Sequence, residues 1–296
     1  MIFYGFLSDG APALFSKQCF FATINPMNKT LICITFVLSI FGFGGSVSSA
    51  DFEKGLEAAE RKDYATALRE WEPLAEEGLA SAQSNLGLMY RLGQGVNKDV
   101  VTAVKWYSLA AEQGYADAQS NLGLMFRNGE GVQRDYKKAL KWYTLAAEQG
   151  DADAQYNLGS MYDEGLGVSQ DYSAAVKWYR LSAAQGIAFA QYNLGLMHRS
   201  GQGVTRDDKE AVRWYRLAAE QGFASAQTNL GIMYAFGYGV AKDYVYAFMW
   251  GGLGASNGSI NGGKLRDDFA RRMNSSQIAN AKKLARECVR KQYKGC

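Results

Sequence analysis

The sequence predicts an all-α solenoid, a stack of helix pairs that repeats along the chain. The string A-Q-x-N-L-G-x-M occurs five times between residues 82 and 233, and each copy begins 36 residues after the previous one. A fixed period of this length is typical of proteins in which one supersecondary unit is copied and stacked. Within each copy, two stretches with helical spacing flank a glycine-containing turn, so each unit is expected to be a helix pair.

The first stretch of each copy predicts an amphipathic helix. In the second copy, Ala118, Leu122, Met125 and Phe126 recur every three to four residues, which places them on one face of an α-helix. A glycine recurs in the middle of this helix, at a cost of roughly 1 kcal/mol relative to alanine. Because all five copies keep it, we expect the glycine to make room for the Trp and Tyr of the second helix. These glycines are Gly87, Gly123, Gly159, Gly195 and Gly231.

The second stretch predicts a helix with its own start and stop. In the second copy, Asp135 precedes it and can accept hydrogen bonds from the free N–H groups of its first turn. Gly129 permits the positive φ with which the first helix ends, and Gly150 ends the second helix. The repeated tryptophan is expected in the core of the helix pair. It stands at Trp106, Trp142, Trp178, Trp214 and Trp250.

The repeated motifs resemble those of the Sel-1-like repeat family, a branch of the tetratricopeptide-like α/α solenoids. The second copy shows A-Q-S-N-L-G-L-M-F from residue 118, G-E-G-V-Q-R-D from residue 129 and A-L-K-W-Y-T-L-A-A-E-Q-G from residue 139. The likeness covers about Ala65 to Gly254. It implies a right-handed superhelix of about five helix pairs and a role as a protein–protein adaptor in envelope or signalling processes.

The segments that flank the array are predicted to cap it. We assign residues 79–258 to the array and residues 51–78, which contain a partial repeat, to N-terminal capping helices. Residues 259–296 carry ten Lys or Arg against three Asp or Glu and keep helical apolar spacing. We predict a capping helix pair with a solvated basic face, in which Ser275 or Ser276 caps the second helix. A binding role for that face is the alternative.

The N-terminal segment predicts export. Residues 27–50 have the pattern of a signal peptide, with Lys29 before an apolar run at 31–43 and small residues at 48–50. A membrane span needs roughly 20 apolar residues, so a retained anchor is disfavoured. We interpret residues 1–26 as a start assigned too early, with translation from Met27, and a long leader is the alternative. The mature chain is expected to begin at Asp51 and to be periplasmic or secreted.

Two cysteines, Cys288 and Cys296, remain in the expected mature chain. Exported proteins often pair such cysteines, so we predict a disulfide between them, and two free thiols are the alternative. The expected mature chain is near neutral, with 30 Lys or Arg against 28 Asp or Glu. This balance gives no indication of a nucleic-acid partner.

No residue constellation points to catalysis. The single histidine, His198, takes the place of Tyr or Phe in the other copies, so we expect a structural role. No His/Cys cluster has metal-ligand spacing, and the G-x-G-V loops lack the G-K-[ST] element of phosphate-binding loops. We expect no enzyme activity, cofactor or metal.

The alternative is an envelope hydrolase of the β-lactamase type or a cell-wall-binding protein of the same fold. The repeats lack the paired cysteines of that family branch, and the chain has no S-x-x-K motif.

Related tetratricopeptide solenoids line their concave face with the first helix of each pair. The corresponding positions vary between the copies of this chain while the core positions repeat, which predicts a groove specialised for a protein or peptide partner. Drift of unconstrained surface positions gives the same pattern and is the alternative. Tyr and Arg are common anchors in interfaces. The predicted groove residues are Arg91, Asp117, Arg127, Asp153, Tyr156, Asp163, Phe189, Tyr192, Arg199 and Phe236.

Overall fold

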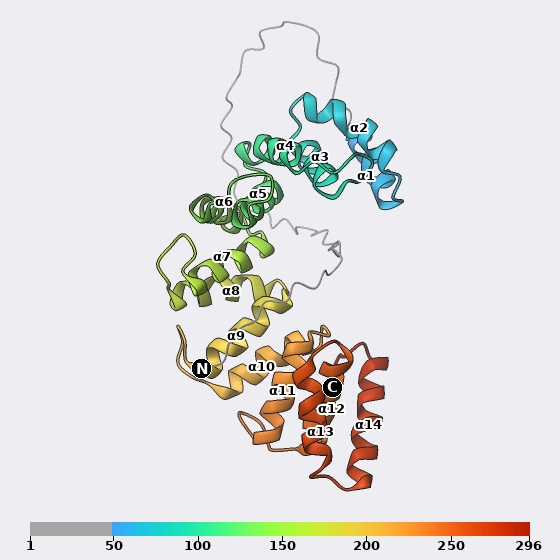
Figure 1. The fold of residues 1–296 in the computed structure, drawn as a ribbon, viewed down its shortest axis with the longest axis vertical. Coiled ribbons are helices and arrows are strands. Elements are labelled where there is room, and N and C mark those ends of the chain that lie inside the picture. Colours follow the sequence, from blue (N-terminus) through green and yellow to red (C-terminus); the bar gives the residue numbers. More distant parts are fainter. Residues whose placement is uncertain (1–48) are drawn as a thin grey trace, which may run out of the picture. The chain divides into compact units, whose positions relative to one another are not determined.

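The computed structural model describes residues 49–296, which contain fourteen α-helices and no strand. Figure 1 shows the helices following one another in chain order. They are α1 (Ser49–Glu60), α2 (Tyr64–Glu76), α3 (Ala80–Leu92), α4 (Val100–Glu112), α5 (Ala116–Asn128), α6 (Tyr136–Glu148), α7 (Ala152–Glu164), α8 (Tyr172–Ala184), α9 (Ala188–Ser200), α10 (Asp208–Ala219), α11 (Ala224–Phe236), α12 (Tyr244–Ser256), α13 (Ile260–Ala270) and α14 (Ser275–Arg290).

Helices α3 to α12 form five pairs, one for each copy of the sequence repeat. Each first helix packs along the second helix of its own pair, and that second helix packs in turn on the first helix of the next pair. The predicted all-α solenoid of helix pairs is confirmed. No helix in residues 49–296 combines the length and the apolar character that crossing a membrane requires.

Local signals set the ends of the repeated helices as predicted. Asp135 is the N-cap of α6, and its side chain accepts a hydrogen bond from the Lys138 backbone N–H at 3.0 Å. Gly129 ends α5 with a φ of 73°, a conformation that strongly favours glycine. The equivalent aspartates Asp99, Asp171, Asp207 and Asp243 cap the other second helices in the same way.

In four of the five copies the buried core residue is the tyrosine after the repeated tryptophan, so the prediction for the tryptophans is wrong in those copies. Tyr143 is 0% exposed and lies in the cluster formed by α6 and α7. Trp142 is half-buried, packs against the cluster formed by α4 and α5, and has the Lys141 ammonium 5.3 Å from its ring. Consecutive helical residues point about 100° apart, so only one can enter the centre of the pair. Trp250 alone of the repeated tryptophans is fully buried.

The repeated mid-helix glycine makes room for this tyrosine ring. A Cβ on Gly123 would lie 2.8 Å from Cδ1 of Tyr143, and the glycines of the first, third and fourth copies face their tyrosines in the same way. In the fifth copy, Gly251 holds the place of the tyrosine. There the Leu265 side chain of α13 comes closest to a Cβ on Gly231, at 2.8 Å. The predicted close approach is therefore confirmed, with Tyr rather than Trp as the neighbour in four copies.

A ladder of glutamines links consecutive pairs. The buried Gln119 amide donates to the Ala111 carbonyl of α4 at 3.1 Å, and Gln149 donates to the Gln119 side-chain oxygen at 2.8 Å. The same two bonds recur along the array. Because a buried amide without partners is costly, this ladder explains why the glutamine of A-Q-x-N-L-G repeats.

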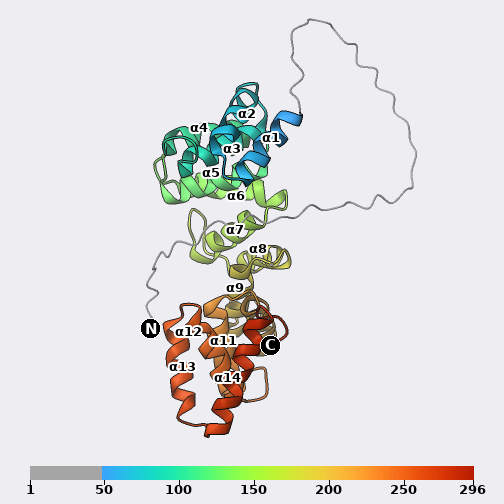
Figure 2. The same ribbon diagram turned by 90° about the vertical axis from the view of Figure 1, so that its right-hand side faces the viewer.

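The flanking helices differ in how they pack. Asp63 caps α2, as its likeness to a second helix suggests, and α1 packs on α2. At the other end, α13 and α14 both lie beside α12 (Figures 1 and 2). Asn274 caps α14 through a capping box with Gln277, so the prediction of Ser275 or Ser276 is wrong by one residue.

The structure contains the predicted disulfide but describes almost none of the predicted export segments. Cys288 and Cys296 are joined by a disulfide, with their Cα atoms 5.6 Å apart. The predicted leader, 1–26, and signal peptide, 27–50, lie outside the described residues, except for the last two residues of the signal peptide, with which α1 begins.

Candidate protein-binding surface

All ten predicted groove residues lie on the first helices of the pairs, α3, α5, α7, α9 and α11. Their surroundings divide them into three groups. One column, at the second-to-last residue of the first helix, packs against neighbouring residues of the array in four copies. A second group gathers acids and aromatic rings near the helix N-termini. A third is an aromatic pair at the C-terminal end of α11.

The two arginines of the first copies tie neighbouring repeats together. Arg91 donates to both carboxylate oxygens of Glu130 at 3.2 and 3.3 Å and to the Asn121 side chain at 3.3 Å. Arg127 donates to the Asn157 side chain at 3.1 Å and to Ser160 at 3.2 Å. Bidentate pairing of a partly buried guanidinium is a strong contact. These arginines therefore hold the stack in register and have few donors left for a partner, in contrast to the role predicted for them.

The later members of the same column also contact neighbouring groups. Asp163 accepts a hydrogen bond from the Tyr179 hydroxyl at 3.3 Å, and burial raises the pKa of its carboxyl group. The Arg199 guanidinium lies 5.6 Å from the ring centre of Tyr238, in the turn of the next repeat. This distance fits a cation–π contact. The column thus contributes to repeat packing in four copies.

Aromatic rings from three consecutive repeats form a continuous row. The ring centre of Phe189 on α9 lies 5.8 Å from that of Tyr156 on α7 and 4.8 Å from that of Phe223, which precedes α11. Phe223 in turn lies 5.2 Å from Tyr192. Aromatic pairs at these distances attract each other. Phe189 is nevertheless 54% exposed, so the row presents a large apolar side chain to solvent.

Three carboxylates lie beside this row. Asp153 is one helical turn before Tyr156, and Asp117 and Asp151 lie near it at the N-termini of α5 and α7. Desolvation raises the pKa of Asp153, and the Asp117 carboxylate raises it further. Desolvation also raises the pKa of Asp151, although its hydrogen bond from the Ala154 N–H opposes this. None of the three forms an ion pair with a Lys or Arg of residues 49–296.

These two groups form what we call the aromatic–acidic surface, which consists of Asp117, Asp151, Asp153, Tyr156, Phe189, Tyr192 and Phe223. Phe236 lies apart from it. Phe236 is 56% exposed, stacks on Tyr238 at 5.7 Å and meets Phe269 of α13 at 6.2 Å. The sequence prediction missed Phe223 and Asp151, which occupy the residue just before the first helix. In the sequence, this position differs from the core positions only because its residue changes between the copies: Leu79, Tyr115, Asp151, Ile187 and Phe223.

His198 lies on the core side of α9. It is buried, its Nδ1 has no hydrogen-bond partner among the described residues, and burial lowers its pKa. Its place matches the expectation of an aromatic position that changed to histidine. No group of three or more His, Cys, Asp or Glu in residues 49–296 is arranged to hold a metal ion.

Comparison with known proteins places the repeats in one family. The Sel1 repeat model matches residues 80–115, 116–151, 152–187, 188–223 and 224–259. A Sel1 repeat protein from Oxalobacter formigenes is 36% identical over 72% of this chain and 88% of its own, with a TM-score of 0.67. A protective antigen of uropathogenic Escherichia coli that displays an SLR fold is 27% identical over 83% of this chain and 70% of its own, with a TM-score of 0.41.

Comparison with the curated proteins finds no match. The five contiguous repeat matches, together with the identity to the Oxalobacter formigenes protein, show that this chain belongs to the Sel1 repeat family.

Proposed function

We propose that this protein is an exported scaffold that binds a protein partner through the aromatic–acidic surface. Sel1 repeat proteins are generally non-catalytic scaffolds for protein interaction, and the five repeats give this chain the same architecture. The observation that carries the choice of surface is Phe189, a phenylalanine held by two aromatic neighbours and still 54% exposed.

The aromatic row has the features of an interface anchor. A rigid ring that is already positioned loses little conformational entropy when a partner covers it. Tyr156 and Phe223 fix Phe189 from both sides, so a partner side chain placed over it would bury apolar area on a preformed platform. We therefore expect the partner segment to carry an apolar or aromatic residue at this point.

The carboxylates indicate which charge the partner should carry next to its apolar residue. Asp117, Asp151 and Asp153 repel one another, and none has a cationic partner within residues 49–296. A Lys or Arg from the partner would relieve this repulsion, so we expect a basic residue next to the apolar anchor. A bound cation favours the charged carboxylates. Because the pKa values of Asp151 and Asp153 are raised in the free protein, acidification should protonate these two carboxylates early and weaken binding.

Export is part of the proposal and rests on the signal pattern of residues 27–50. The protein would then act in the periplasm or outside the cell. N-terminal sequencing of the protein isolated from the envelope or medium tests this, with Asp51 as the expected first residue. A protein that keeps its apolar run at 31–43 would contradict cleavage at this point.

Site-specific cross-linking tests the binding surface. A photoreactive phenylalanine analogue replaces Phe189 in the protein expressed in its own cells, and a matched protein carries the analogue at Leu145 on the second helix of another pair. Leu145 is also exposed and lies on α6, which contributes no residue to the aromatic–acidic surface. We expect a discrete cross-linked product from position 189 and none from position 145. Products of equal yield from both positions would contradict the proposal.

A further inference from the structure

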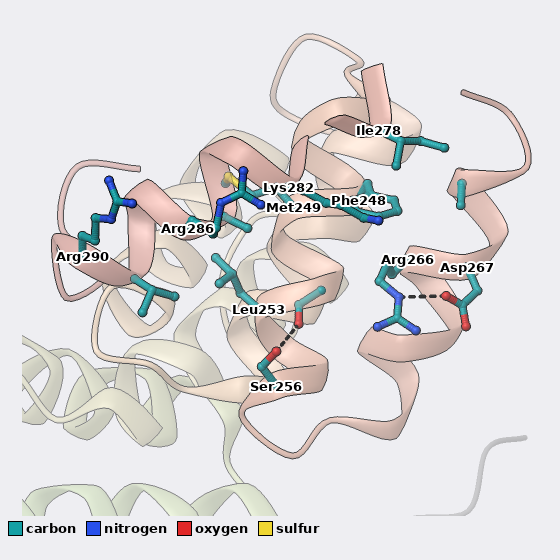
Figure 3. A pocket seen from close by; sticks show the side chains of 14 residues that line it. Phe248, Met249, Leu253, Ser256, Arg266, Asp267, Ile278, Lys282, Arg286 and Arg290 are labelled. Atoms are coloured by element: carbon teal, nitrogen blue, oxygen red, sulfur yellow. Dashed lines mark hydrogen bonds and ion pairs between the residues drawn. The ribbon is translucent and has the colours of Figure 1, made fainter. Parts of the chain in front are cut away.

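A pocket of about 830 Å³ opens among the three C-terminal helices, away from the aromatic–acidic surface. Phe248, Met249 and Leu253 of α12 form its apolar floor, and α13 and α14 form its walls. Figure 3 shows Arg266 of α13 across the opening from Arg286 of α14, with Leu253 between them. The pocket therefore combines an apolar floor with basic walls.

The repeat register explains why this space is open. α13 begins 36 residues after α11 and so takes the place of the first helix of a sixth copy. In the five complete copies, a second helix packs along the first, but α14 packs on α12 and hardly contacts α13. In the repeat register, Arg266 and Asp267 of α13 correspond to Leu230 and Gly231 of α11, which face the second helix of their pair, α12. On α13 these two positions line the pocket instead. The position of a sixth second helix is thus left without an occupant along α13.

The basic side chains on the pocket walls favour binding of an acidic segment. Lys282, Arg286 and Arg290 recur every four residues of α14, so they lie about 6 Å apart along one face. None of them forms an ion pair with an acid of the described chain, whereas Arg266 pairs with Asp267 at 2.7 Å. A row spread over two turns suits a helix with acids one turn apart better than a ligand with one anionic group.

The opposite end of the same chain carries such a helix. On α1, the exposed residues Glu53, Leu56, Glu57 and Glu60 follow the spacing i, i+3, i+4 and i+7, which places them on one face. Leu56 is 39% exposed, and acids surround it. The only ion pair of this face is the exposed contact between Glu57 and Arg61 at 3.7 Å. The face is therefore acidic with one apolar side chain, complementary to the basic pocket with an apolar floor.

We propose that the acidic face of α1 from a second copy of this chain docks in the pocket between α13 and α14. Leu56 meets the apolar floor, and the glutamates meet Lys282, Arg286 and Arg290. The two surfaces differ, so the contact is head-to-tail and continues from copy to copy unless the copies close into a ring. The contact is small and rimmed by charges, so it forms weakly and is sensitive to salt.

Sedimentation velocity of the protein isolated after export tests this association. The weight-average mass should rise with protein concentration at about 50 mM salt and return to that of the monomer at about 500 mM, because salt screens exposed charges. A monomer at every concentration in low salt overturns the proposal.

A variant that fills the pocket separates docking from general charge attraction. A Cβ on Gly252 would meet only the Arg266 side chain, at 3.7 Å, so a larger side chain fits there without disturbing the fold. Gly252→Leu should abolish association by occupying the floor, whereas Gly252→Ala should leave most of it. Equal association of Gly252→Leu and wild type overturns the proposal.

Charge exchange identifies the two surfaces. Arg286→Glu/Arg290→Glu and Glu53→Lys/Glu57→Lys should each weaken association by about tenfold or more. An equal mixture of the two variants should associate again, because the unchanged α1 of one variant meets the unchanged pocket of the other and the two reversed surfaces also carry opposite charges. Lys283→Glu/Lys291→Glu is the matched control, since it changes the charge of the same region equally outside the pocket lining. If the control weakens association as much as Arg286→Glu/Arg290→Glu, the attraction is general and the proposal fails.

Discussion

Truncating the two adjacent aromatic residues of a second helix should have unequal effects, because only one of them fills the core. Tyr143 is 0% exposed and packs with Leu158 and Met161. Its ring covers Gly123, which has no side chain to fill the space after truncation. Tyr143→Ala should therefore lower the free energy of unfolding by about 3–5 kcal/mol, the usual cost of a buried aromatic truncation. Trp142 already exposes part of its ring, so Trp142→Ala should cost only about 2 kcal/mol.

Urea denaturation followed by far-ultraviolet circular dichroism measures both effects at one protein concentration. Tyr143→Phe is the matched control, since it removes only a hydroxyl that is buried without a hydrogen-bond partner among the described residues. Its free energy of unfolding should change by less than about 1 kcal/mol, and toward greater stability. The reasoning is refuted if Trp142→Ala costs as much as Tyr143→Ala.

Three further outcomes follow from the structure. Gly123→Ala should lower the melting temperature although alanine favours helices, because its Cβ would lie 2.8 Å from the Tyr143 ring. Burial lowers the pKa of His198 below 6.5, so its contribution to stability is lost as pH falls below that value, and His198→Phe should flatten this dependence in denaturation at pH 5 to 7. Thiol titration of the denatured, unreduced protein should find neither Cys288 nor Cys296 free.

The sequence predicted the fold because its strongest signals are local and repeated five times. Helix starts at Asp135 and its equivalents, and helix ends at Gly129 and its equivalents, depend on backbone groups within a few residues. The core prediction failed where two large aromatic residues are adjacent. Periodicity gave both Trp142 and Tyr143 an apolar position, and the distance to Gly123 is what identifies the tyrosine as the central one.

The binding surface was predicted only in part, for reasons that involve contacts between repeats. A variable column containing Arg91 and Arg127 has the same pattern whether the residues contact a partner or the next repeat. The bonds to Glu130 and Asn157, 30 or more residues away, decide that they link repeats. Phe223 was missed because it precedes its helix, and its contact with Phe189 on the neighbouring repeat became evident only from the packing.

The central claim is that a partner binds at Phe189, and calorimetric titration of the cross-linked partner in purified form tests it most directly. Phe189→Ala removes a side chain that is 54% exposed, so the fold should be unaffected. The loss of a central anchor should weaken binding by about 2 kcal/mol or more, close to thirtyfold. Leu145→Ala, equally mild for the fold, should bind as wild type. Wild-type affinity for Phe189→Ala, or a larger loss for Leu145→Ala, would contradict the account.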